Sequence, residues 1–161
     1  MKEITVALVV KNVARDIREI IERLLDQNCP KEKYEILVID TGSTDNTIPI
    51  LNGYRGKVRI IKTRATTGKG RFLALKHAKG KIVAFTDGDV YLPKNFVSKI
   101  LKGFQRDESV VCVNWPSITY PDKGFFYKCM GALWDGPSAI SIYPGAKDGL
   151  WPGYRTGKYR R

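Results

Sequence analysis

Short runs of β-branched and aliphatic residues alternate along this 161-residue chain with segments of helical periodicity. Five runs have the length and composition of strands, namely 4–10, 34–39, 58–62, 82–86 and 110–115. Helical patterns lie between them, over 17–25, from Ser43 or Thr44 to Leu51, over 72–78 and over 93–104. Strands that alternate with helices form βαβ units, so the sequence predicts a three-layer α/β/α domain with a mostly parallel central sheet.

The length and the cysteine content narrow the class of protein. We expect one domain over 1–161, because this length suits a single hydrophobic core. The chain has no apolar stretch long enough to span a membrane, and its start leads straight into a strand pattern without a secretory signal. Cys29, Cys112 and Cys129 are odd in number and widely spaced, which favours reduced thiols and a cytoplasmic location. The scarcity of glutamine weakly indicates a thermophilic source.

The chain is strongly basic, with 28 Lys and Arg against 16 Asp and Glu and a net charge of +12. Such a charge attracts nucleic acid, anionic lipid or phosphorylated substrates, although a charge run is most often only a solvated face. The basic residues concentrate in 57–81 and in the tail 154–161. The sequence lacks a Walker P-loop, a dinucleotide-binding glycine motif and any known nucleic-acid-binding motif. These absences disfavour an NTPase, a dehydrogenase and a nucleic-acid partner.

Two aspartates follow the predicted strand 82–86 directly, in the tripeptide Asp87-Gly88-Asp89. Ligands of open α/β sheets bind at the carboxyl edge, where these carboxylates are expected to lie. Neighbouring carboxylates repel each other unless a cation sits between them. Mg²⁺ and Mn²⁺ are the natural choice, since such ions take one or two carboxylates together with substrate phosphate oxygens. The alternative is a solvated Asp-Gly turn.

Polar residues follow two further strands at the same edge. Asp40 ends the second strand and begins the segment Asp40-Thr41-Gly42-Ser43-Thr44-Asp45, and Asn12 follows the first strand. Ser43 or Thr44 is expected to cap the next helix. Capping does not account for Asp40, which precedes the cap. Three strand ends therefore offer polar groups to one crevice.

The ordered combination of these motifs resembles the signatures of family-2 glycosyltransferases. The motifs are the strand before Asn12, residues 38–45, residues 68–75 and Asp87-Gly88-Asp89, and the resemblance covers roughly residues 4 to 105. It implies a GT-A fold with a nucleotide-binding half over about 1–115 and an acceptor or variable region over about 116–161. It also implies transfer of a sugar from a nucleotide-diphosphate donor, UDP- or GDP-linked, with Mn²⁺ or Mg²⁺ as cofactor.

The resemblance assigns roles to particular residues. Asp40 would bind the nucleotide base, with a further contact from the segment between Val10 and Asn12. Lys69 and Arg71 fall where the family often has polar or basic residues near the nucleotide. In the aspartate motif, Asp87 would approach the ribose and the metal, and Gly88 would contact the nucleotide sugar. Asp89 would coordinate the metal that bridges the diphosphate.

The resemblance implies inverting transfer, in which a carboxylate takes the proton of the acceptor hydroxyl. Family members usually supply this base in a downstream Glu-Asp, which is absent here after residue 89. We take Asp148 as the hypothesis for the base, because its separation from Asp89 is closest to that of the family. Asp135 is the second choice. It is at least as plausible that neither is catalytic.

Two other readings stay open. The chain could be a catalytically incomplete module that binds a nucleotide sugar, or, less favoured, a basic nucleic-acid-binding protein. The acceptor is not identified, and a glycan, a lipid or a protein all remain. Peripheral association with the cytoplasmic face of a membrane is also suggested by the basic and aromatic tail, which could touch anionic headgroups. The residues concerned are Tyr154, Lys158, Tyr159, Arg160 and Arg161.

Overall fold

A mixed β-sheet with helices on both faces forms the part of the chain that the computed structural model describes, residues 2–90, 92–105 and 142–144. Within these residues the strand order is β3-β2-β1-β4-β5. The strands are β1 (Ile4–Val10), β2 (Tyr34–Asp40), β3 (Arg59–Lys62), β4 (Ile82–Thr86) and β5 (Ile142–Pro144). The first four are parallel, and β5 pairs antiparallel with β4.

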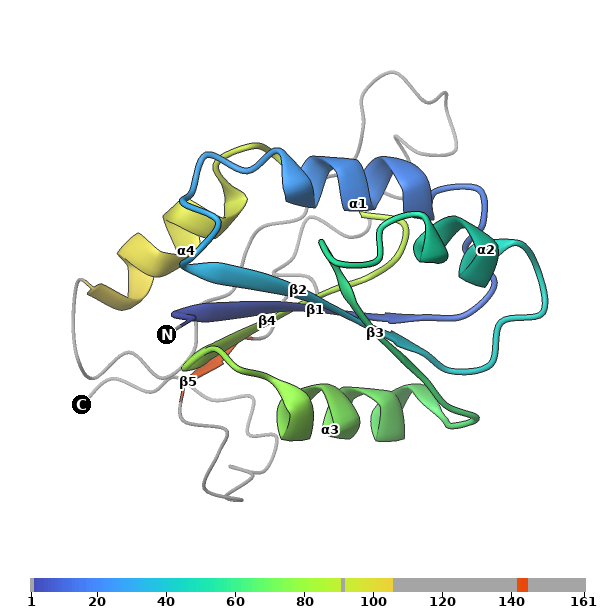
Figure 1. Ribbon diagram of the computed structural model, residues 1–161. Coiled ribbons are helices and arrows are strands. Elements are labelled where there is room, and N and C mark those ends of the chain that lie inside the picture. The colour runs from blue at the N-terminus through green and yellow to red at the C-terminus, as the bar shows by residue number, and fades with distance from the viewer. Residues whose placement is uncertain (1, 91, 106–141, 145–161) are drawn as a thin grey trace, which may run out of the picture.

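The helices divide into two layers. They are α1 (Ile17–Leu25), α2 (Thr47–Asn52), α3 (Thr67–His77) and α4 (Phe96–Gln105). Figure 1 shows α3 alone on one face of the sheet, with α1, α2 and α4 over the other face. The predicted three-layer arrangement with a mostly parallel sheet is therefore confirmed.

The two faces of the sheet bury different amounts of apolar surface. Beneath α1 and α4, the large side chains of Leu8, Ile21 and Phe96 belong to one extensive core. Beneath α3, a smaller core contains Leu37 and Ala74. The near-continuous apolar sequence of β1 and β2 follows from this burial on both faces.

The register aligns the carboxyl ends of the central strands. Val10 pairs with Asp40 across β1 and β2, and Leu8 pairs with Thr86 across β1 and β4. The residues that follow these strands therefore meet at one edge, as the sequence predicted for Asp40 and the Asp87 motif.

Element boundaries differ from prediction most at α3. The apolar pattern indicated a start near Phe72, yet α3 begins at Thr67, after Thr66 accepts a hydrogen bond from the Lys69 N–H (3.4 Å). The first turn of α3 packs against the sheet at Gly70, and a glycine does not add to a pattern of apolar residues in the sequence. Helix α4 begins at Phe96 rather than near Pro93. The predicted strand 110–115 lies outside the described residues.

Within the ranges described above, no helix has both the length and the apolar character needed to cross a membrane.

Candidate functional site at the carboxyl edge of the sheet

Asp40 ends β2 with its side chain turned inward, and only 3% of the residue is exposed. Its Oδ1 accepts hydrogen bonds from the backbone N–H groups of Gly42 and Ser43, both at 3.1 Å. Gly42 has φ of +107°, which is a left-handed backbone conformation that glycine adopts without strain. The other oxygen, Oδ2, is buried and has no hydrogen-bond partner among the described residues. A buried carboxylate oxygen in this state is an acceptor that lacks its donor.

Asn12 fastens the loop after β1 to the loop after β2. Its Oδ1 accepts from the Thr44 N–H (2.8 Å), and its own N–H donates to the Ser43 hydroxyl (2.9 Å). Asn12 has φ of +54°, a region that asparagine tolerates better than most residues. The predicted position of Asn12 at this edge is confirmed, and its contacts hold the loop that follows Asp40 against the loop after β1.

Asp45 and Thr47 strengthen the same junction. The Ala14 N–H donates to Asp45 Oδ2 (3.0 Å), and the Val13 N–H donates to the Thr47 hydroxyl (2.9 Å). Hydrogen bonds from the Thr47 hydroxyl and backbone N–H, and from Ala14, lower the pKa of Asp45 against the opposing effect of burial.

The expectation that Ser43 or Thr44 caps α2 was wrong. The helix begins at Thr47, and the Thr47 N–H donates to Asp45 Oδ1 (3.0 Å). The side chains of Ser43 and Thr44 instead contact Asn12. The residue types alone do not distinguish a helix cap from a contact between loops.

Asp87 and Asp89 follow β4 at the same edge and lie near a cation of the chain. Arg71 Nη2, from α3, lies 3.7 Å from Asp87 Oδ1, and both side chains are nearly half exposed. Burial raises the pKa of Asp87, the Arg71 guanidinium opposes that shift, and the charge of Asp89 adds to it. The negative charge of Asp89 thus acts on the ionisation of Asp87.

Gly88 brings the end of β4 against the end of β1. A Cβ atom built at Gly88 would lie 3.1 Å from a methyl carbon of Val10 and 3.1 Å from one of Val13. Contacts this short leave little room for a side chain. The glycine therefore sets how closely the two aspartates approach the loop after β1.

Gly70 allows a similarly close approach of α3 to the sheet. A Cβ there would lie 2.6 Å from Val9 and 3.0 Å from Thr41, so the helix rests directly on β1 and the loop after β2. This close packing places Arg71 beside Asp87, and Lys69 is exposed in the same helical turn. The sequence did not indicate that Arg71 contacts the aspartate motif.

Thr86 also lies at this edge, although the sequence analysis did not identify it as a candidate site residue. It is the last residue of β4, it is 2% exposed, and its hydroxyl oxygen is buried without a hydrogen-bond partner among the described residues. Its place immediately before the aspartates was the available signal. The candidate bases Asp135 and Asp148 lie outside the described residues.

The donor set fits a hard divalent cation. In the described ranges no three His, Cys, Asp or Glu side chains come together. The Asp87 and Asp89 carboxylates offer oxygen ligands only, which suits Mg²⁺ or Mn²⁺ that draws its remaining ligands from phosphate oxygens and water.

Similarity to known structures gives the class of fold. The crystal structure of Staphylococcus aureus TarS 1–349 in complex with UDP-GlcNAc is 28% identical, with a TM-score of 0.66 over 76% of this chain and 36% of that one. The mannosyltransferase PcManGT from Pyrobaculum calidifontis, in complex with GDP-Man and Mn²⁺, is 22% identical. Its TM-score is 0.68 over 88% of this chain and 44% of that one. These neighbours have the GT-A fold, and this chain shares it.

The sequence comparison gives the family. The model of Glycosyl transferase family 2 matches residues 5–139, so the chain belongs to that family. The poly(ribitol-phosphate) β-N-acetylglucosaminyltransferase TarS of Staphylococcus aureus is 35% identical over 99 residues, 58% of this chain. The match spans only 17% of that relative's length.

Proposed function

We propose that this chain binds a nucleotide-diphosphate sugar and a divalent metal at the carboxyl edge of its sheet and transfers the sugar to an acceptor hydroxyl with inversion. The observation that carries the proposal is the unpartnered buried Oδ2 of Asp40, at the edge that also bears Asp87 and Asp89. One end of this edge offers an acceptor to a base, and the other offers oxygen ligands to a metal.

The proposed recognition of the base follows from the chemistry of the Asp40 carboxylate. Uracil and guanine each present a ring N–H, and Oδ2 of Asp40 is the acceptor that such a donor would satisfy. Oδ1 is held by two backbone N–H groups, so the carboxylate is already oriented before the base arrives. An oriented acceptor saves the entropy of ordering it on binding. UDP and GDP sugars are the proposed donors.

The diphosphate would lie toward the aspartate motif. Asp89 and Asp87 would hold Mn²⁺ or Mg²⁺, and the metal, when bound, would neutralise charge on the departing diphosphate. Arg71 is already beside Asp87, and Lys69 is exposed in the same turn, so two cations are available to phosphate oxygens. Gly88 keeps the space between this motif and Val10 free of a side chain.

Inversion requires a carboxylate that accepts the proton of the attacking hydroxyl while the bond to the diphosphate breaks. Asp148 is the proposed base, because its separation from Asp89 is closest to that of the family, and Asp135 is the alternative. The relatives agree with the general chemistry, since one is named a poly(ribitol-phosphate) β-N-acetylglucosaminyltransferase and its structure holds UDP-GlcNAc. The acceptor could be a glycan, a lipid or a protein, and a cytoplasmic location is proposed from the spaced cysteines.

The test is release of UDP or GDP from sugar donors in the presence of Mn²⁺, with and without cell-derived acceptor fractions. Asp89→Ala is expected to abolish turnover, and Glu32→Ala, an exposed carboxylate elsewhere, to leave it unchanged. Metal-dependent donor binding without turnover in any fraction would favour the second reading, a module that only binds the donor. Turnover that survives Asp89→Ala in full would contradict the proposal.

A further inference from the structure

The basic charge of the protein is segregated along the sequence. Between Asp45 and Asp87 there is no acidic residue. The same stretch contains ten Lys and Arg: Arg55, Lys57, Arg59, Lys62, Arg64, Lys69, Arg71, Lys76, Lys79 and Lys81. Of these, Arg59 and Arg71 form ion pairs with described residues, and the other eight are exposed without one. This stretch includes β3 and α3, so among the described residues α3 carries several exposed cations without an ion-pair partner.

Helix α3 presents an unusual outer face within that charge. Gly70 and Ala74 are buried and turn toward the sheet. Successive residues of a helix are rotated by about 100° around its axis. Phe72 is two residues from both Gly70 and Ala74, so it lies about 200° around the helix from them and points away from the sheet. Its exposed fraction is 51%, and it is the exposed large hydrophobic residue of the described part of the chain.

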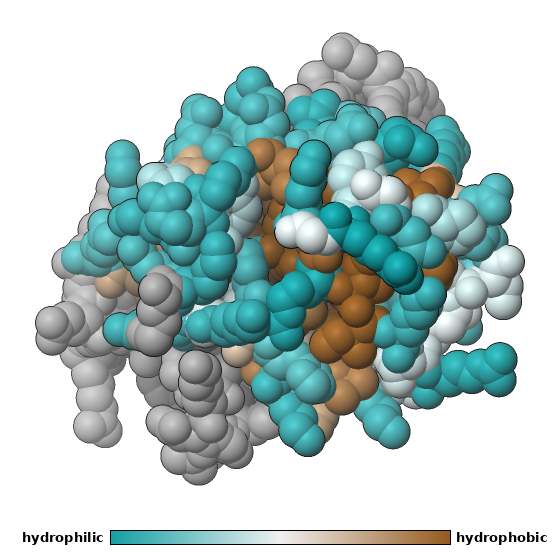
Figure 2. Space-filling model, in the orientation of Figure 1, coloured by the Kyte–Doolittle hydropathy of each residue, from teal (hydrophilic) through white to brown (hydrophobic). Residues whose placement is uncertain are grey.

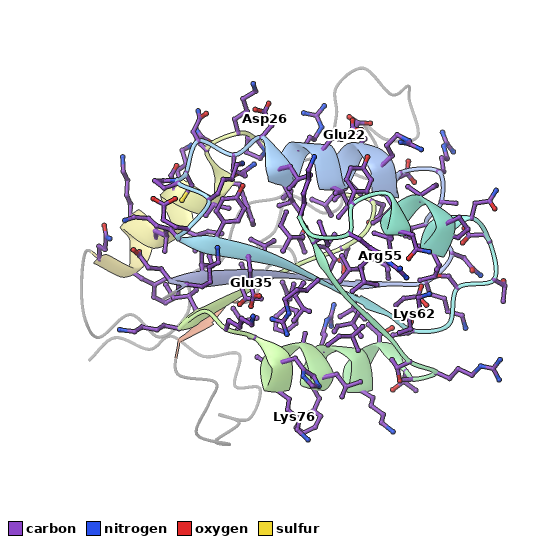
Figure 3. All side chains as sticks on the ribbon, viewed as in Figure 1. Glu22, Asp26, Glu35, Arg55, Lys62 and Lys76 are labelled. Carbon is purple, nitrogen blue, oxygen red and sulfur yellow. The ribbon has the colours of Figure 1, made fainter. Side chains whose placement is uncertain are left out.

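Exposed lysines lie within about one helical turn of Phe72 on either side. Lys69 and Lys76 stand three residues before and four residues after Phe72, which places them on the same side of the helix. Lys79 follows just beyond the helix end and is also exposed. Figure 3 shows Lys76 directed away from the sheet, and Figure 2 shows hydrophilic side chains projecting along the lower border, where α3 lies in Figure 1. We call Phe72, Lys76 and Lys79 the α3 outer face.

A ring at the centre of a cationic surface distinguishes between kinds of anionic partner. A hydrated polyanion in solution satisfies the lysines but gains little from the ring, because it leaves the ring in water. An anionic lipid surface satisfies both, since its headgroups attract the lysines while an aromatic side chain enters the boundary between headgroups and acyl chains. We propose that the α3 outer face docks this protein onto anionic lipid.

Docking in this way would leave the candidate site open. The first turn of α3 reaches the carboxyl edge, where Arg71 contacts Asp87. The edge would therefore lie beside the lipid surface rather than beneath it, within reach of an acceptor held there. The docking itself needs neither nucleotide nor metal, so it stands or falls independently of the proposed function.

The experiment is co-flotation of the full chain with vesicles, without nucleotide. One set is phosphatidylcholine alone, and the other contains about one third phosphatidylglycerol to give an anionic surface. Three variants are compared with wild type: Phe72→Ser, Phe72→Leu and the double variant Lys76→Glu/Lys79→Glu. The matched control is Arg18→Glu/Lys102→Glu, which makes the same change in net charge with exposed residues of α1 and α4 on the opposite layer.

Binding is expected only to the anionic vesicles. Phe72→Ser should weaken vesicle binding about tenfold, because it removes the ring that enters the lipid. Phe72→Leu, which keeps an apolar side chain, should retain most of the binding. The Lys76 and Lys79 variant should weaken binding by about tenfold or more. The Arg18 and Lys102 control should stay close to wild type. Thermal unfolding of each variant checks that the fold is retained.

Three results would overturn the proposal. The first is no binding of wild type to the anionic vesicles. The second is a Phe72→Ser variant that binds as tightly as wild type, which would make the surface a general polyanion site. The third is a control variant that loses as much binding as the α3 variant, which would mean that net charge alone acts.

Discussion

Arg71 Nη2 stands 3.7 Å from Asp87 Oδ1, across the gap between α3 and the end of β4. Both side chains are nearly half exposed, and such an ion pair contributes about 0–1 kcal/mol to stability. The contact therefore does little for the fold. It places one positive charge beside a carboxylate that also faces Asp89, where a metal and a diphosphate are proposed to bind.

Asp87→Asn should affect metal-dependent nucleotide binding without lowering the stability of the fold. The raised pKa of Asp87 means that its ionised form is disfavoured in the folded state, by burial first and by Asp89 as well. Removing the charge at pH 7 should leave the free energy of unfolding unchanged or raise it by about 0.5 kcal/mol, because exposure screens the effect. Metal-dependent nucleotide binding should be lost. Calorimetric titration and chemical denaturation measure the two quantities, and a variant that keeps metal-dependent binding would contradict the assignment.

Asp40→Asn tests the base pocket with almost no change of shape. The remaining side-chain oxygen can still accept from the Gly42 and Ser43 N–H groups, while an amide NH₂ replaces the buried Oδ2. Opposing a base N–H with a donor should weaken UDP or GDP binding by about 10- to 100-fold. The melting temperature should stay near that of wild type. Equal affinity for wild type and variant would show that Oδ2 does not receive the base.

Gly70→Ala and Gly68→Ala form a matched pair in the first turn of α3. A Cβ at residue 70 would meet Val9 at 2.6 Å, whereas a Cβ at residue 68 meets nothing within 4 Å. Gly70→Ala should lower the free energy of unfolding by about 1–3 kcal/mol through overpacking. Gly68→Ala should raise it by up to about 1 kcal/mol through helix propensity. Urea denaturation measures both, and equal effects would contradict the close packing of α3.

Asn12→Ala and Asn12→Gly separate the backbone conformation from the hydrogen bond. Both variants lose the acceptor for the Thr44 N–H, but only alanine is strained at φ of +54°. Asn12→Ala should therefore be less stable than Asn12→Gly by about 1 kcal/mol. Both should bind nucleotide more weakly than wild type, because the contact between the loops after β1 and β2, beside Asp40, loosens. Nucleotide affinity equal to wild type in both variants would show that this junction does not shape the pocket.

The environment of Glu35 predicts how the stability of the folded protein depends on pH. Its side chain is 7% exposed and lies between the sheet and α3 (Figure 3). It accepts from Arg59 Nη1 (2.7 Å), the Thr5 hydroxyl (2.7 Å) and the Lys79 N–H (2.6 Å). Burial alone would raise the pKa of Glu35, but these hydrogen bonds outweigh it and the pKa is lowered.

A lowered folded-state pKa stabilises the protein above the unfolded-state pKa, about 4.3, and the benefit disappears as the pH falls through the folded-state value. Glu35→Gln should therefore cost about 2 kcal/mol at pH 7, since it weakens charged hydrogen bonds. The difference from wild type should narrow below about pH 4. Thermal unfolding of both proteins from pH 7 to pH 3 measures this, and a difference independent of pH would refute it.

The sequence predicted the layers and the edge of the site well because both depend on short-range patterns. Continuous apolar runs indicated strands buried on both faces, and the residues directly after them had to lie at the carboxyl edge. This reasoning placed Asp40, Asn12 and Asp87 at that edge. It needs no knowledge of which side chains touch.

Contacts between distant segments could not be predicted in the same way. Ser43 and Thr44 have the chemistry of helix caps, yet they bind Asn12, more than thirty residues away in the chain. The start of α3 was hidden because Gly70 packs by its lack of a side chain. Phe72 was counted with the apolar side of its helix, although it points outward. Helical periodicity of apolar residues misleads where small residues make the buried contact.

The most direct test of the central claim is calorimetric titration of UDP and GDP, with and without Mn²⁺, into wild type, Asp89→Ala and the control Glu32→Ala. We predict that one nucleotide binds, that Mn²⁺ strengthens its binding, and that Asp89→Ala removes the effect of the metal while Glu32→Ala does not. Failure of wild type to bind either nucleotide, with or without Mn²⁺, would contradict the proposed donor site.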